Sequence, residues 1–251
     1  MAETIITRGV VLREQPTGER DRLVTILTED IGVIRAFVNG AKSAKSKTAS
    51  STDLLCCSKF TISRSNSNVF TVREASVIKL FFSLRQDIVL LSLAQYIGEI
   101  AVELSPREAE AAEQLRLVLN AFSFLADSKK SPVLIKAASE LRLLTLAGYM
   151  PSLVACDNCG RYESESMFFD PFNGKLYCSD CEAAVPRQAK KTGLGVITAM
   201  RYICFCQPEK VFSFNLPDDS LKALSSLSET YLRNVTARNY KTLDFYKQMT
   251  E

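Results

Sequence analysis

The stretches CDNCG (residues 156–160) and CSDC (residues 178–181) form two Cys-x-x-Cys pairs. A two-residue spacer lets two thiolates from one tight turn point at a common centre, and two such pairs close around one tetrahedral zinc ion. Four unrelated reduced cysteines or a pair of redox dithiols are the alternatives, and the paired spacing favours the metal. The predicted ligands are Cys156, Cys159, Cys178 and Cys181.

The predicted metal is one structural Zn²⁺. The chain contains no histidine, and four thiolates leave no open position at which a zinc ion could activate water. The surrounding segment, residues 149–184, is rich in turn-forming residues and too polar to fold alone. We therefore expect metal binding to supply folding free energy to a zinc-knuckle insertion over residues 149–184.

Charge argues against contact between the cysteine segment and phosphate groups. Between Cys156 and Cys181 its basic residues, Arg161 and Lys175, are outnumbered by Asp157, Glu163, Glu165, Asp170 and Asp180. Such a surface is not expected to face phosphates. We expect the zinc site to brace the domain that carries it.

The composition is that of an ordinary globular protein. The chain has 251 residues and is 47% hydrophobic. Apolar runs such as IVLLSLA (residues 88–94) are too short to span a bilayer, and the N-terminus lacks a signal-peptide pattern. Cysteine usage fits a reducing compartment, with Cys56, Cys57, Cys204 and Cys206 expected as buried small hydrophobes. We predict a soluble, cytoplasmic protein without membrane contact.

Residues 1–80 are predicted to be β-structure. Short runs rich in Val, Ile, Thr and Phe are separated by turn signals, with no helical pattern between them. The predicted strands cover residues 4–13, 22–28, 32–39, 54–63 and 68–75, which indicates a small barrel or sandwich. Alternation within the third strand places Arg35 on the same face as Phe37.

Residues 81–251 are predicted to be helical. Apolar residues advance in steps of three or four, as on one face of a helix. Ser105-Pro106-Arg107-Glu108 carries the start signals of a second helix, and Ser131-Pro132 those of a third. The predicted helices cover residues 84–105, 106–125, 131–148, 192–206 and 218–235, followed by a short last helix. The expected fold is α+β and multidomain.

Three motifs together resemble the RecO family of bacterial recombination mediators. They are GERDRLVTILTEDIGVIRAFVNGAKSAKS (18–46), LAGYMPSLVACDNCG (146–160) and FNGKLYCSDC (172–181). A cysteine quartet alone occurs in many zinc ribbons, but its order and distance from the N-terminal motif make the likeness specific over essentially the whole chain. Family members commonly carry more arginine after the basic segment, whereas residues Ala49 to Thr52 of this chain are neutral. Many relatives have lost some of the cysteines, whereas this chain keeps all four.

The resemblance implies the fold and the activity together. It implies an oligonucleotide-binding (OB) barrel over residues 1–80 and a helical domain over residues 81–251 that bears the zinc knuckles. It also implies binding of single- and double-stranded DNA, annealing of complementary strands, and action with the partner RecR in helping RecA displace single-strand DNA-binding protein. A groove on the helical domain would take the C-terminal tail of that protein, and the location implied is the bacterial cytoplasm, with the nucleoid.

The predicted DNA contacts lie in a basic part of the barrel. The sequence from Ile31 to Arg64 contains six basic residues and one acidic residue, Asp53. This excess of positive charge suggests a surface that binds a polyanion, although an ordinary solvated loop can have the same composition. The predicted main contacts are Arg35, Lys42, Lys45 and Lys47, with Arg20, Arg22, Lys59 and Arg64 as additions. Phe37 is either a stacking ring beside Arg35 or, as phenylalanine more often is, part of the core.

Two other classes of function compete with the mediator. An enzyme would need carboxylates, lysine or tyrosine for acid–base chemistry, and no phosphate loop or paired-carboxylate motif is visible in the sequence. We therefore predict no catalytic residues. A transcription-type zinc ribbon or an adaptor without DNA-annealing activity is the second alternative.

Overall fold

The computed structural model describes residues 3–41 and 48–250. The chain divides into two compact units: Met1–Asp127 together with Thr242–Glu251, and Ser128–Lys241. Lys42, Lys45 and Lys47, three of the predicted DNA contacts, lie outside the described residues.

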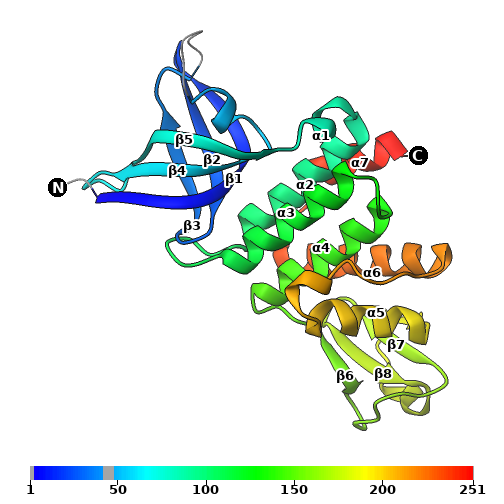
Figure 1. The fold of residues 1–251 in the computed structure, drawn as a ribbon. Coiled ribbons are helices and arrows are strands. Elements are labelled where there is room, and N and C mark those ends of the chain that lie inside the picture. Colours follow the sequence, from blue (N-terminus) through cyan, green and yellow to red (C-terminus); the bar gives the residue numbers. More distant parts are fainter. Residues whose placement is uncertain (1–2, 42–47, 251) are drawn as a thin grey trace. The chain divides into compact units, whose positions relative to one another are not determined.

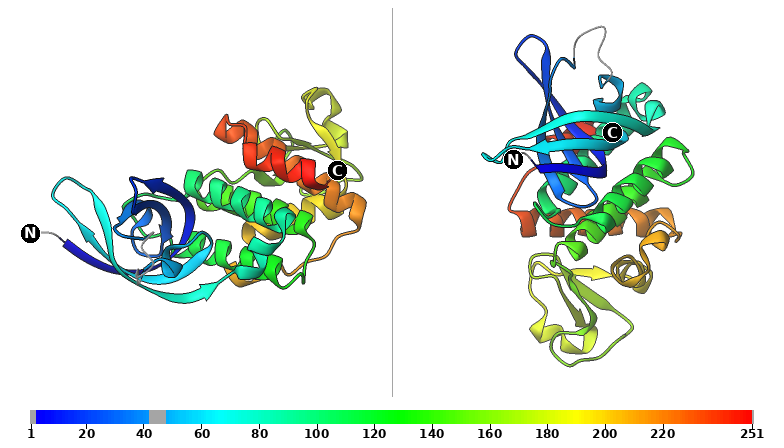
Figure 2. Two further views of the ribbon diagram at one scale, coloured as in Figure 1. Left: turned by 90° about the horizontal axis from the view of Figure 1, so that it is seen from above. Right: turned by 60° about the vertical axis from the view of Figure 1, so that its left-hand side comes forward.

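The first unit contains the five predicted strands, which are confirmed. They are β1 (Glu3–Thr17), β2 (Asp21–Thr28), β3 (Gly32–Val38), β4 (Cys56–Arg64) and β5 (Phe70–Leu80). They close into a barrel in the order β1-β2-β3-β5-β4 (Figures 1 and 2). The β3–β5 contact is parallel and short, and the other four are antiparallel.

The pleat of β3 separates the barrel core from the outer surface. Ile34, Ala36 and Val38 belong to the core cluster, whereas Arg35 is exposed and Phe37 is half-buried. Successive side chains of a strand point to opposite faces, so Arg35 and Phe37 share the outer face, as predicted. Phe37 is therefore not a core residue, although the usual burial of phenylalanine favours that interpretation.

Helices α1 (Phe82–Gln86), α2 (Ile88–Leu104), α3 (Ala112–Ala126) and α7 (Lys241–Thr250) follow. At the start of α2 the side chain of Asp87 accepts hydrogen bonds from the N–H groups of Val89 and Leu90, which satisfies two of its free donors. Thr242 Oγ1 on α7 donates to Glu99 Oε2 on α2 at 2.7 Å. None of the helices in the described residues has the length and hydrophobicity needed to cross a membrane.

The second helix starts later than predicted. Residues 106–111 are not helical, and α3 begins at Ala112. Their backbone instead bonds to the β2–β3 hairpin: Val33 N–H donates to the carbonyl of Pro106 at 2.9 Å, and Glu108 N–H donates to that of Ile31 at 3.1 Å. Gly32 has φ +66°, and a Cβ there would overlap the Pro106 carbonyl oxygen. Tertiary hydrogen bonds have overridden the local start signals.

The second unit combines three helices with a small sheet. Helices α4 (Pro132–Leu146), α5 (Leu194–Phe205) and α6 (Asp218–Thr236) lie close to their predicted positions, and α6 packs against α4. The sheet comprises β6 (Ser152–Cys156), β7 (Met167–Asp170), β8 (Lys175–Cys178) and β9 (Lys190–Thr192), in the order β6-β8-β7-β9. These four strands were not predicted.

A charged cluster is buried between α4 and α6. Lys136 Nζ lies 2.8 Å from Glu140 Oε1 and 3.1 Å from Glu229 Oε2, and the side chains of Lys136 and Glu140 are 3% and 0% exposed. Ser228 Oγ donates to Glu140 Oε2, and Lys136 also reaches Ser225 Oγ at 3.2 Å. The contact between the two helices thus includes charged side chains that are buried away from water and hydrogen-bonded to one another.

Candidate metal centre and nucleic-acid interface

The four cysteines project from strand ends and the turns that follow. Cys156 ends β6 and Cys178 ends β8, while Cys159 and Cys181 lie in the next turns. Gly160 has φ +75°, and its N–H donates to the Cys156 carbonyl at 2.9 Å, so the turn uses a conformation that favours glycine. Two adjacent strands thus deliver both Cys-x-x-Cys turns to one end of the sheet.

The four sulfurs can hold one metal ion. All four Sγ atoms lie within 4.8 Å of one another, and Cys159 Sγ is 3.5 Å from Cys178 Sγ. Zinc–sulfur bonds of about 2.3 Å at a tetrahedral angle place the sulfurs roughly 3.8 Å apart. Cys156 and Cys178 are buried, while Cys159 is exposed. The geometry and the all-thiol donor set fit a structural metal ion.

The thiols differ in acidity. Burial raises the pKa of the Cys156 thiol, but backbone N–H groups of Cys159, Cys178 and Asn158 donate to its sulfur and lower the pKa to about 6. Burial, together with hydrogen bonds to Cys159, Cys181 and Cys156, raises the pKa of the Cys178 thiol to about 12. A divalent cation at the centre would favour the thiolate at every position, because thiolate is the form that binds metal.

Arg201 on α5 ties the knuckle to the helices of the second unit. Its guanidinium donates to the carbonyls of Leu153 at 2.7 Å, Tyr162 at 2.8 Å and Val154 at 3.2 Å. It also lies 3.2 Å from a carboxylate oxygen of Glu163 and stacks 4.0 Å from the Tyr162 ring centroid. Arg201 therefore fixes the chain on both sides of the first cysteine turn, a role that its place in a helical pattern did not reveal.

The predicted DNA contacts of the barrel fall into two groups. Arg20, Arg35 and Lys59 are exposed in the β1–β2 turn, on β3 and on β4. They are not brought together, because β3 and β4 are separated by β5 in the barrel.

Arg22 and Arg64 already have partners within the chain. Arg22 lies 3.1 Å from Glu14 and 2.9 Å from Asp53. Arg64 lies 2.9 Å from Glu108 and stacks 5.5 Å from the Phe70 ring centroid. The carboxylates neutralise much of the charge that these two residues would offer to phosphates.

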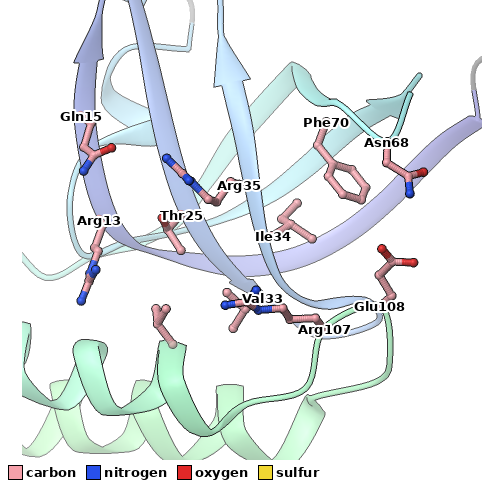
Figure 3. Close-up of a pocket in the computed structure, with 11 residues that line it drawn as sticks. Arg13, Gln15, Thr25, Val33, Ile34, Arg35, Asn68, Phe70, Arg107 and Glu108 are labelled. Carbon is pink, nitrogen blue, oxygen red and sulfur yellow. The ribbon is translucent and has the colours of Figure 1, made fainter. Parts of the chain in front are cut away.

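A groove of about 500 Å³ runs along the outer face of β1–β3 and the connector that precedes α3 (Figure 3). Arg13, Arg35 and Arg107 line it, and only Arg35 was predicted as a DNA contact. Arg13 and Arg107 come from separate parts of the sequence, and only the fold brings them to one surface. The remaining lining residues are Gln15, Thr25, Val33, Ile34, Asn68, Phe70, Val102 and Glu108.

The groove is electropositive. Arg13 lies 3.2 Å from Glu99, and Glu108 lies beside Arg64. Within the part of the chain that the structure describes, no carboxylate lies within ion-pair distance of Arg35 or Arg107. Two unneutralised guanidinium groups, with neutral side chains that can form hydrogen bonds, make this surface suitable for phosphate groups.

Two family models together match nearly the whole chain. The model described as Recombination protein O N terminal matches residues 1–81, and the one described as Recombination protein O C terminal matches residues 85–244.

Full-length relatives agree with the two models. The chain is 32% identical over 243 residues to the DNA repair protein RecO of Acetivibrio thermocellus, which covers 97% of this chain and 96% of that protein. It is 26% identical over 241 residues to the DNA repair protein RecO of Dehalococcoides mccartyi, covering 94% and 92%. The protein of the same name from Caldicellulosiruptor bescii is 25% identical over 243 residues, covering 97% and 98%.

Proposed function

The chain belongs to the RecO family of DNA repair and recombination proteins, and we propose that it is a recombination mediator. In this proposal it binds single- and double-stranded DNA and anneals complementary strands. With RecR it helps load RecA onto DNA coated with single-strand DNA-binding protein, whose C-terminal tail it binds. Its place would be the bacterial cytoplasm, with the nucleoid.

The observation that carries the proposal is the electropositive groove of the barrel. OB barrels bind strands through a cationic groove that follows the phosphates, with aromatic rings for the bases. The closed order β1-β2-β3-β5-β4 supports an OB-type domain over residues 1–80. Arg35 and Arg107 would contact phosphates, and the half-buried Phe37 lies on the same face of β3 as Arg35.

Residues 81–251 form the helical domain in this proposal, with a zinc-binding insertion over residues 149–184. Cys156, Cys159, Cys178 and Cys181 would hold one structural Zn²⁺. The compactness of the Sγ cluster supports this assignment, because closed four-thiolate sites are typical of structural zinc. The metal would fix the fold of the insertion and take no part in chemistry.

Strand annealing separates the mediator from its alternatives. We expect the purified protein to accelerate pairing of complementary oligonucleotides coated with single-strand DNA-binding protein, followed by fluorescence transfer between labels on the two strands. Because no catalytic site is proposed, the same mixture should release neither phosphate nor cleaved DNA when nucleotide and Mg²⁺ are added. An adaptor without DNA contact would leave the annealing rate at its spontaneous value, and turnover of nucleotide or DNA would indicate an enzyme.

Charge reversal in the barrel should weaken the salt dependence of DNA binding. Each phosphate contact to a single strand contributes about 0.7 to the slope of log affinity against log salt. Replacing Lys42, Lys45 and Lys47 with glutamate should therefore lower the slope by about 2, and R35E/R107E should lower it by more than about 1. Fluorescence anisotropy of a labelled oligonucleotide at several salt concentrations measures this slope.

The control for the arginine pair is K222E/K241E, which makes the same change in net charge at two exposed lysines of the second unit. The slope of this control should stay at the wild-type value. If the barrel variants also keep the wild-type slope, the DNA contact lies elsewhere in the chain.

A further inference from the structure

A second basic surface lies in the second unit, on the edge strand β9 and the turn before it. Arg187, Lys190 and Lys191 are all exposed. The sequence contains no acidic residue from position 183 to 208. Among the described strands β9 pairs only with β7, so it is an edge strand of the sheet.

These three cations differ from Arg161, Lys175 and Arg201 of the same unit in having no carboxylate partner among the residues that the structure describes. Arg161 is paired with Asp180, Lys175 with Asp157 at 2.9 Å, and Arg201 with Glu163 at 3.2 Å. No such ion pair joins Arg187, Lys190 or Lys191 to any acidic group that the structure describes.

Four carboxylates of the cysteine segment have partners within the second unit. Asp157, Asp180 and Glu163 pair with cations, and the buried Asp170 accepts hydrogen bonds from Asn173 and Gln188. Three carboxylates of the cysteine segment are thus paired with cations, whereas Asp170 is bonded to neutral amides and the exposed Glu165 and Glu182 have no ion pair among the described residues.

An aromatic ring accompanies the charge. In the register of the sheet Lys191 lies opposite Phe168 on β7, and Phe168 lies opposite Tyr177 on β8. Directly opposed residues project to the same face of a sheet, so Lys191 and Phe168 share a face, whereas Lys190, opposite Phe169, projects to the other face of this edge strand. Phe168 is half-buried, so it is partly accessible across the ladder from Lys191. A cation next to an accessible ring is the combination that binds unpaired nucleotides through phosphate contact and base stacking.

We propose that Arg187, Lys190 and Lys191, along the edge of the sheet at β9, form a second contact for single-stranded DNA together with Phe168, additional to the barrel groove. This inference rests on the proposed annealing function. A second contact would allow one molecule to hold two DNA strands at once. The occupant is a single strand, because only unstacked bases could reach Phe168. Lysines on an edge strand also prevent edge-to-edge pairing of sheets, and that role alone would require no DNA contact.

The test compares R187E/K190E/K191E with K210E/K222E/K241E, which changes the net charge equally at exposed lysines of the same unit. Two non-complementary oligonucleotides carrying a donor and an acceptor dye report a complex of two strands on one molecule. A second assay measures the annealing rate of complementary strands. Zinc content and circular dichroism establish that each variant is folded, and R187A/K190A/K191A provides a milder change.

We expect the β9 variant to bind one strand through the barrel but to lose the two-strand complex and at least about tenfold of the annealing rate. The charge control should retain both. The salt slope for the second strand should fall by about 2, from three lost phosphate contacts. F168A should weaken two-strand binding while leaving the slope unchanged.

Two results would overturn the inference while leaving annealing itself established. In the first, the β9 variant matches the charge control in both assays, which would leave protection of the sheet edge as the role of its lysines. In the second, the β9 variant loses affinity for duplex but not for single strands. If wild-type protein itself fails to anneal, the proposed function fails, and this inference fails with it.

Discussion

Replacing Cys178 with serine is expected to remove stoichiometric zinc and to unfold the cysteine segment. Cys178 is fully buried at the end of β8, with its sulfur 3.5 Å from that of Cys159. A serine hydroxyl is a poor zinc ligand, and apparent binding free energies of structural zinc reach about 10–16 kcal/mol in small zinc domains. Loss of one ligand should therefore lower the stability of the second unit by more than any surface substitution does.

Zinc content by atomic spectroscopy and thermal unfolding by circular dichroism measure this result. Cys206→Ser is the matched control, because Cys206 is a half-buried cysteine outside the cluster and should leave zinc content unchanged. A C178S protein with full zinc content and a wild-type melting temperature would contradict the assignment. So would a fully folded C178S protein that had lost DNA binding, since the knuckle would then contact DNA directly.

Lys136→Met is expected to destabilise the second unit by about 3–5 kcal/mol, the cost of leaving a buried charge without its partner. Glu140 has no exposed surface and lies 2.8 Å from Lys136 Nζ. The double variant K136M/E140L should recover most of the loss, because apolar side chains of similar size commonly replace a buried ion pair without penalty. Glu229 would keep its ion pair with Arg233 at 3.4 Å.

Denaturant unfolding of the zinc-bound protein gives the free energies for this comparison. K222M makes the same substitution at an exposed position of α6 and should change stability by less than about 0.5 kcal/mol. A single variant within that range, or a double variant as unstable as the single one, would show that the cluster does not hold α4 and α6 together.

The regular elements could be predicted because their patterns are local. Alternation along β3 placed Arg35 and Phe37 on one face, and the burial of Ile34, Ala36 and Val38 on the other confirms it. The helix start at Pro106 was wrong, because the carbonyl of Pro106 bonds to Val33 in the hairpin. No local signal reveals a hydrogen bond to a strand some seventy positions earlier in the chain. Strands β6–β9 were missed since each has five residues or fewer.

The site residues follow the same division. The cysteine quartet was visible because metal-ligand spacing is written in the sequence. Whether a basic residue is paired with a carboxylate was not visible in the sequence. Arg22 pairs with Asp53, which is 31 positions away, and Arg64 pairs with Glu108, which is 44 positions away. For the same reason composition could not distinguish these paired cations from Arg107, which the fold leaves facing the groove. Charge counts found the basic region, and only the ion pairs show which charges remain available.

The contact between α7 and α2 also has a consequence for the order in which the chain folds on the ribosome. Thr242 meets Glu99 across 143 positions, and the whole of the second unit is translated between them. At bacterial elongation rates that interval lasts roughly 7–30 s. The unit that carries the cysteine cluster is therefore fully synthesised before the barrel unit receives its last helix. Until then the nascent α2 lacks its α7 partner, although its own synthesis ended long before.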